Sequence, residues 1–228
     1  MEKGNNSFVS IGVIIGNRDF FPDKLVGECR SDLIEAFNKA GIKPIMLDES
    51  ETKLGGVETF HEAQKCAALF KKHANEIMGV LVVLPNFGDE KGVAETLKLA
   101  GLNVPVLVQA YPDDLDKLDV ARRRDAWCGK ISVCNNLYQF GIKFSLTTKH
   151  VVHPSDESFA KDLKEFIGVC RVVKGLRNVR IGAVGARPGA FNTVRYSEKI
   201  LQRNGISVVT IDLSQILGAA EKLTKNDN

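Results

Sequence analysis

The sequence has no hydrophobic run that approaches a membrane span and no stripe of basic residues. The chain has 228 residues, of which 44% are apolar, yet none of its apolar runs reaches the roughly 20 residues of a membrane helix. Its 31 Lys and Arg residues are scattered among 28 Asp and Glu residues, for a net charge of +3. A nucleic-acid surface would need a concentrated basic patch. We therefore expect neither a membrane nor a nucleic acid among its partners.

Several motifs of enzyme chemistry are also missing. The chain contains no G-x-G-x-x-G and no G-x-x-x-x-G-K-[ST] sequence, which form the phosphate cradles of dinucleotide and P-loop sites. It has no G-x-S-x-G elbow. Its five cysteines form no C-x-x-C pair, and an odd count fits reduced thiols. The amino terminus, MEKGNNSFVSIGVIIG, leads directly into a strand, without a secretory leader. We expect a cytoplasmic protein.

What the sequence does have is a regular alternation of strands and helices. Nearly continuous apolar runs, typical of strands buried on both faces of a parallel sheet, predict strands at 8–15, 43–47, 79–85 and 104–111. Helices are predicted between them at 22–40, 57–77 and 90–100. This alternation predicts an α/β fold, a doubly wound (Rossmann-like) parallel sheet flanked by helices. The most apolar strands, 9–15 and 80–84, should be central.

A second, shorter α/β pattern follows. Ser155 is placed to cap a helix that runs to about residue 170. Beyond it, strands are expected at 180–184 and 206–211 with a helix at 192–204 between them, and Asp212 heads a last helix. A two-stranded unit rarely stands alone. These strands therefore either extend the first sheet or belong to a chain that has been cut.

The stretch between the two patterns, from Asp125 to Val152, is dense in unusual polar residues. A helix over 126–140, ended by a left-handed Gly141, would carry two stripes. The apolar stripe contains Trp127, Ile131, Cys134 and Tyr138, and the polar stripe contains Ser132, Asn135, Asn136 and Gln139. Uncharged amides both donate and accept hydrogen bonds, which suits a neutral polyhydroxylated ligand. Alternatively, the helix is partly buried and its amides satisfy nearby backbone groups.

Ligands of open parallel sheets bind beyond the carboxyl ends of the strands. The loops there carry Arg18, Asn86 and Arg187, and His150 ends the central stretch as a single possible contact. Alternatively, the glycines of these loops make turns and the arginines pair with nearby carboxylates. The candidate substrate-binding residues are Arg18, Asn86, Asn135, Gln139, His150 and Arg187. The three-residue spacing of His150 and His153 puts them on opposite sides of an extended chain, a poor metal pair, and His153 better serves the turn.

Two long blocks carry a resemblance to a known family. RRRDAWCGKISVCNNLYQFGIKFSLTTKHVV and FAKDLKEFIGVCRVVKGLRNVRIGAVGARPGAFNTVRYSEKIL resemble the L-fucose isomerase and L-arabinose isomerase-like family, and more closely its L-fucose isomerase-related branch. The likeness runs from Phe8 onward and spans only the amino-terminal half of such proteins. It implies that residues 1–174 form the amino-terminal Rossmann-like domain and that 175–228 open a second α/β domain, probably truncated.

The resemblance implies a homo-oligomeric aldose–ketose isomerase in which a divalent metal, usually Mn²⁺, polarises the sugar while acidic residues move a proton through an enediol. The family's metal ligands and catalytic acids lie beyond this stretch, so we carry over no catalytic residue and no metal ligand. The first βα loop, where Arg18 stands, holds a sugar contact in the family. A different class stays open, a non-catalytic sugar-binding module that resembles periplasmic-binding or repressor-core domains.

Overall fold

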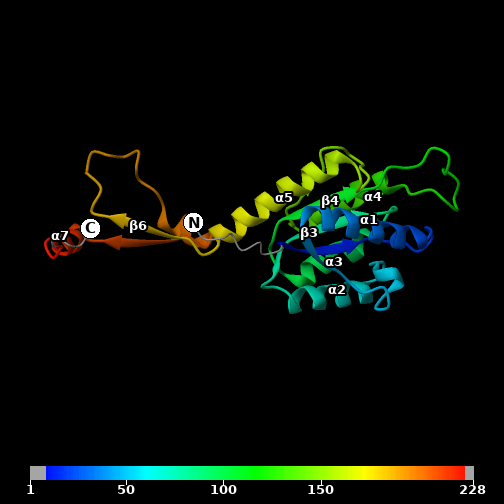
Figure 1. The fold of residues 1–228 in the computed structure, drawn as a ribbon, viewed down its shortest axis with the longest axis horizontal. Coiled ribbons are helices and arrows are strands. Elements are labelled where there is room, and N and C mark those ends of the chain that lie inside the picture. The colour runs from blue at the N-terminus through cyan, green and yellow to red at the C-terminus, as the bar shows by residue number, and fades with distance from the viewer. Residues whose placement is uncertain (1–8, 224–228) are drawn as a thin grey trace. The chain divides into compact units, whose positions relative to one another are not determined.

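The computed structural model describes residues 9–223, and the chain divides into two compact units, Met1–Arg171 and Val172–Asn228. The first unit contains a five-stranded parallel sheet (Figure 1). Its strand order is β2 (Ile42–Ile45), β1 (Val9–Ile15), β3 (Ile77–Leu84), β4 (Val106–Ala110) and β5 (Ser145–Leu146). Both β1 and β3 have a partner on each side. The central position expected for these two strands is confirmed.

Helices cover both faces of this sheet. On one face lie α1 (Lys24–Ala40) and α5 (Glu157–Leu176), where a Cβ added to Gly79 of β3 would meet Cys170 and Phe166 of α5. On the other lie α2 (Phe60–Lys72), α3 (Glu90–Ala100) and α4 (Ala126–Gln139). A Cβ added to Gly12 of β1 would meet the ring of Phe70 in α2. The doubly wound α/β architecture is confirmed.

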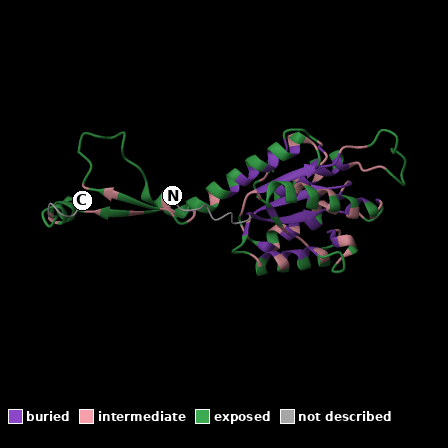
Figure 2. Ribbon diagram, viewed as in Figure 1, coloured by how far each residue is buried: buried purple, intermediate pink, exposed green. Residues whose placement is uncertain are grey.

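The core lies between these layers (Figure 2). Every residue of β1 is buried, as are all residues of β3 except Met78. Both faces of a central parallel strand are covered, so its sequence is apolar almost throughout. This is why these strands could be predicted from the sequence.

Some element boundaries differ from the sequence-based expectation. Helix α2 begins at Phe60, not near Val57, because Thr59 and Glu62 form a capping box there. The Val57 backbone instead donates to Ile15 O and accepts from Asn17 N, as a bridge at the sheet edge. Likewise, α5 begins at Glu157, and the Ser158 N–H donates to Asp156, so Ser155 is not its cap. The two-residue strand β5 was missed because it is too short to show a pattern.

The second unit contains β6 (Arg180–Val184), α6 (Glu198–Arg203), β7 (Ser207–Ile211) and α7 (Leu213–Ala220). In the described part of the chain, β6 and β7 pair in parallel with each other and form a sheet of their own. The strand order of the first sheet includes neither of them. The predicted helix at 192–204 is only six residues long, since residues 192–197 are irregular apart from a turn at 193–194. Across residues 9–223, no helix is long and apolar enough to span a membrane.

Candidate functional site at the carboxyl edge of the sheet

A buried pair of asparagines joins the carboxyl ends of β1 and β3. The Asn86 amide donates to Asn17 Oδ1 at 2.6 Å, and the Gly88 N–H donates to Asn86 Oδ1 at 3.0 Å. Asn17 Nδ2 donates in turn to Asp23 and Glu58, at 3.1 and 3.0 Å. Both asparagines are almost fully buried, so this pair fixes the loops above the sheet.

A cation lies over the outer end of this network. Lys53 Nζ is 3.6 Å from Asp23 Oδ1 and 3.5 Å from Glu58 Oε2. Removal from water raises the pKa of Glu58, because burial penalises the charged carboxylate, while the Asn17 hydrogen bond and the Lys53 charge act in the opposite direction. The Glu58 charge raises the pKa of Lys53. The positive charge of Lys53 therefore partly offsets the negative charges of the two carboxylates.

Arg18, in the first βα loop, has two partners. Its guanidinium makes a 3.3 Å ion pair with Glu90 and lies 4.6 Å from the centre of the Phe87 ring. The Glu90 oxygen is buried but has no hydrogen-bond partner, so the contact with Arg18 is electrostatic and not a well-aligned hydrogen bond. Phe87 also stacks on Phe21, with ring centres 6.2 Å apart. Arg18 thus covers an aromatic surface at the edge of the sheet.

Two further arginines line the same edge from the segment before α4. Arg124 donates to Pro85 O at 2.9 Å and lies 3.4 Å from Glu28. Arg123 is paired with Asp125 at 3.2 Å. Both guanidinium groups have carboxylate partners, and Arg124 ties the segment to the end of β3.

Helix α4 approaches the backbone of Phe87, beyond the end of β3, at Gly129 in its first turn. A Cβ added to Gly129 would lie 1.6 Å from the carbonyl oxygen of Phe87, so only glycine permits this approach. The buried face of α4 is made of Ala126, Gly129, Lys130, Val133 and Leu137. The predicted apolar stripe is therefore not the buried face of this helix. Trp127, Ile131 and Tyr138 are exposed, because the contact with the Phe87 backbone selects the small residues for the inner face.

Trp127 and His150 pair at the start of α4. Their ring centres are 4.6 Å apart, and both residues are exposed. Beneath them Lys130, only 2% exposed, donates from Nζ to His150 O and to Thr147 Oγ1, each at 2.8 Å. Lys130 thereby fixes the loop that holds His150 against Trp127.

Burial of Lys130 has a consequence for pH dependence. Desolvation lowers its pKa to about 8, from an ordinary value of 10.5. Below pH 8 both the folded and unfolded states bind this proton, so the penalty on the folded state is complete. Between pH 8 and 10.5 the folded state releases the proton first, and its free energy of unfolding gains from this group as the pH rises.

We expect the stability difference between wild type and Lys130→Met to shift by about 1 kcal/mol in favour of wild type from pH 8 to pH 9. Urea denaturation at the two pH values measures it. The matched control is Lys143→Met, at an exposed lysine, for which the difference should not change with pH. A constant difference for Lys130→Met would show that Lys130 keeps its ordinary affinity for protons.

The structure brings only some of the predicted site residues together. Arg18, Asn86 and His150 all lie at the carboxyl edge, although both ends of the Asn86 amide already have protein partners. Asn135 and Gln139 are exposed on α4. They lie about 14 and 20 Å along the helix from its start at the edge, by the rise of 1.5 Å per residue. Arg187 belongs to the second unit, where it lies over Tyr196.

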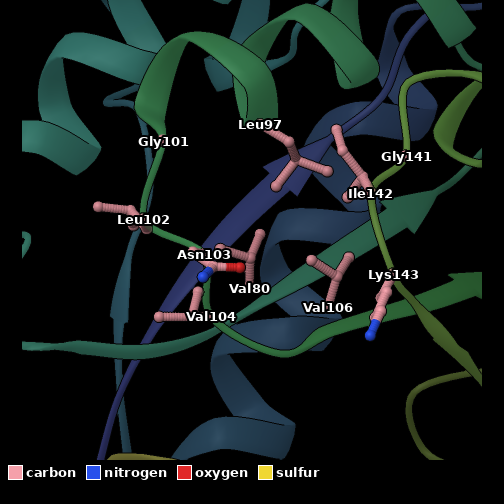
Figure 3. A pocket seen from close by; sticks show the side chains of 10 residues that line it. All are labelled: Val80, Leu97, Gly101, Leu102, Asn103, Val104, Val106, Gly141, Ile142 and Lys143. Atoms are coloured by element: carbon pink, nitrogen blue, oxygen red, sulfur yellow. The ribbon is translucent and has the colours of Figure 1, made fainter. Parts of the chain in front are cut away.

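A pocket of about 320 Å³ lies elsewhere, near the starts of β3 and β4 (Figure 3). Its wall is mainly apolar, with Val80, Leu97, Val106 and Ile142 directed toward one another. None of the six candidate residues lines it. It offers no cluster of polar groups for a sugar.

Four residues of this site are not among the predicted substrate contacts: Asn17, Phe87, Trp127 and Lys130. Asn17 had a signal, since it precedes Arg18 in the same loop. Lys130 had one too, because it is the only charged residue between Asp125 and Lys143. A single charged residue on a helix, beside small residues, is compatible with an exposed side chain and also with a buried cation that is hydrogen-bonded.

The comparison with known families agrees with this architecture. Residues 12–177 match the sequence profile described as "Fucose/sulfoquinovose isomerase, N-terminal domain". Among curated proteins, none matches the chain. The family match covers the five-stranded sheet from Gly12 of β1 onward and the helices α1 to α5, including the carboxyl edge described above. The chain therefore belongs to the fucose/sulfoquinovose isomerase family, as a member that contains the family's amino-terminal domain.

Proposed function

We propose that the chain is the amino-terminal part of a cytoplasmic aldose–ketose isomerase that acts on a neutral, L-fucose- or L-arabinose-like sugar. In this proposal it contributes sugar contacts and an oligomer interface, and the metal site lies elsewhere in the enzyme. The family match supports the reaction class. The observation that favours a neutral sugar is the pairing of the cations at the carboxyl edge.

Each of four cations at this edge has a carboxylate partner. Their ion pairs are Arg18–Glu90 at 3.3 Å, Arg123–Asp125 at 3.2 Å, Arg124–Glu28 at 3.4 Å, and Lys53 with Asp23 and Glu58 at 3.6 and 3.5 Å. A sulfonated sugar such as sulfoquinovose carries a fixed negative charge, and to bind any of these four cations it would have to compete with that cation's carboxylate partner. A neutral sugar leaves all four pairs intact.

The groups available to such a sugar are aromatic faces and hydrogen-bonding edges. Trp127, 38% exposed, can cover the apolar C–H face of a sugar ring, while His150 and Arg18 offer donors at its rim. Each net hydrogen bond contributes on the order of 1 kcal/mol. In this proposal, a sugar that is held by a neighbouring subunit is contacted by Asn135, Gln139 and Arg187.

The described residues do not fit a Mn²⁺ site. Among residues 9–223, no three His, Cys, Asp or Glu side chains are grouped closely enough to hold a metal ion. The carboxylates at the edge are instead paired with Lys53 and the arginines. We therefore assign binding and orientation of the sugar, and no step through the metal, to this part of the chain.

The second candidate is a non-catalytic sugar-binding module. Such modules have two comparable lobes, whereas the described chain has one five-stranded sheet and one separate pair of strands. The isomerase proposal therefore ranks first. A reading frame that continues past Asn228 with Glu, Asp and His in an α/β context would support it further.

In the complete enzyme, we expect Trp127→Ala and His150→Ala each to raise the Michaelis constant for the sugar about tenfold, a loss of roughly 1.4 kcal/mol. The melting temperature and kcat should change little, because both side chains are exposed. Tyr138→Ala is the control, since Tyr138 is 79% exposed farther along the same helix. Steady-state kinetics with L-fucose and L-arabinose measure these effects. Unchanged kinetics in both variants would show that the Trp127–His150 pair does not contact the sugar.

A further inference from the structure

Three side chains that are not among the proposed sugar contacts are linked in a row. Ser155 Oγ lies 2.8 Å from His153 Nδ1, and His153 Nε2 lies 3.2 Å from Asp32 Oδ2. The same Asp32 oxygen accepts a hydrogen bond from the Tyr111 hydroxyl at 3.0 Å. The imidazole also packs edge-on against the Tyr111 ring, with centres 5.1 Å apart. The histidine is thus held between a hydroxyl and a carboxylate.

The hydrogen bonds determine which ring nitrogen carries the proton. The backbone N–H of Ser155, which can only donate, points to His153 Nδ1 at 3.2 Å. Nδ1 is therefore an acceptor in the neutral ring, and Nε2 carries the hydrogen that faces Asp32. This is the tautomer in which the imidazole can take the proton of the Ser155 hydroxyl while Asp32 orients it and stabilises its charge.

An apolar groove begins at this serine. It lies between α1 and α5, has a volume of about 650 Å³, and is lined by Asp32, Ser155 and a row of apolar side chains. Four further charged residues also line it, Glu35, Lys39, Lys164 and Arg171. Those apolar residues are Ala36, Ala40, Phe159, Leu163 and Ile167. A groove of this size and character can hold the chain of an aliphatic acyl group.

We propose that Ser155, His153 and Asp32 form an acyl-transfer site that hydrolyses esters whose acyl chain lies in the groove between α1 and α5. Ser155 Oγ attacks the carbonyl carbon and its proton moves to His153 Nδ1. The carbon–oxygen bond to the alcohol then breaks, and the alcohol leaves with that proton. Water attacks the acyl-serine in the same way, which releases the carboxylic acid and restores the hydroxyl.

One feature of the local structure supports this chemistry. Ser155 lies two residues before the first residue of the 20-residue helix α5, whose positive end favours a developing oxyanion. The lack of a G-x-S-x-G elbow is no objection, because such triads occur on unrelated folds and are recognised by geometry. The competing explanation is a turn in which Ser155 and His153 only stabilise the approach to α5.

The purified 228-residue chain with p-nitrophenyl butyrate distinguishes the two explanations. We expect a burst of about one equivalent of nitrophenolate followed by slower turnover, and labelling of Ser155 by a fluorophosphonate, located by peptide mass mapping. Ser155→Ala should abolish the burst and the label and lower the rate at least about 100-fold. Asp32→Asn should slow both labelling and turnover. Ser31→Ala, at an exposed serine of α1, is the control and should leave both unchanged.

Absence of burst and label from the wild-type chain, with a native circular dichroism spectrum, would overturn the proposal. A burst that persists in Ser155→Ala would also overturn it, because another group would then be the nucleophile. Ser155 is exposed and does not cap α5, so the variant should fold. Its melting curve verifies this.

Discussion

We expect Gly129→Ala to destabilise the first unit severely. A Cβ at this position would lie 1.6 Å from the carbonyl oxygen of Phe87 and 2.4 Å from its carbonyl carbon. Both are backbone atoms, so no side-chain rotation relieves the clash, and α4 must move away from the end of β3. Overpacking of a core commonly costs 1–3 kcal/mol, and a backbone clash this close should exceed that range, at about 4 kcal/mol or more. Thermal and urea denaturation measure the loss.

The control for this substitution is Gly168→Ala. Gly168 lies inside α5, and nothing lies within 4 Å of the position of an added Cβ. Alanine is a better helix former than glycine, so this change should stabilise the protein by about 0.5–1 kcal/mol. If Gly129→Ala melts at the wild-type temperature, the close contact between α4 and the Phe87 loop is wrong, and with it the geometry of the carboxyl edge.

We also expect the protein to lose stability steeply above pH 9. Burial raises the pKa of Cys29, Cys66 and Cys170 from 9.0 to about 12 each. A raised pKa means that the thiol's contribution to stability is complete below pH 9 and is lost as the pH rises from 9 toward 12, because the unfolded chain releases its proton first. Each group contributes a slope of about 1.4 kcal/mol per pH unit, so three together contribute about 4.

Lys130 opposes this trend up to pH 10.5, which reduces the net slope there to about 3 kcal/mol per pH unit. Domains are stable by only about 5–15 kcal/mol, so unfolding should occur between about pH 10 and 12. Urea titrations at a series of pH values, with a reductant present, test this. Cys66→Ala should reduce the slope by about 1.4 kcal/mol per pH unit, and Cys128→Ala, at an exposed thiol, should not. A stability independent of pH from 9 to 11 would contradict the burial of these thiols.

The sheet could be predicted from the sequence because its strands are buried on both faces. Val9–Ile15 and Ile77–Leu84 are apolar almost throughout, and their positions between other strands are confirmed. Boundaries set by side-chain capping were harder to predict. The residues of the capping box, Thr59 and Glu62, are present in the sequence, but the predicted helix was started at Val57.

The site was predicted less well than the fold. Arg18 and His150 do lie at the carboxyl edge. Which face of α4 is buried, however, depends on the backbone contact between Gly129 and Phe87. Hydrophobic periodicity does not reveal such a contact. The sequence therefore placed Trp127 on an apolar stripe without identifying the buried face of the helix, and it placed Asn135 and Gln139 in the site. Long-range pairs such as Asn17 with Asn86 depend on the sheet order, and a single sequence does not specify that order in advance.

The sugar-binding claim can be tested on the protein through its single tryptophan. Trp127 is the only tryptophan in the chain and lies at the proposed contact surface, so its fluorescence reports directly on occupancy. Titration with L-fucose should give a saturable change in the millimolar range, weakened in His150→Ala. Sulfoquinovose should give a weaker response, because its charge would have to compete with the carboxylate partners of Arg18, Arg123, Arg124 and Lys53. A fluorescence that L-fucose leaves unchanged, or a tighter response to sulfoquinovose, would contradict the proposal of a neutral-sugar surface.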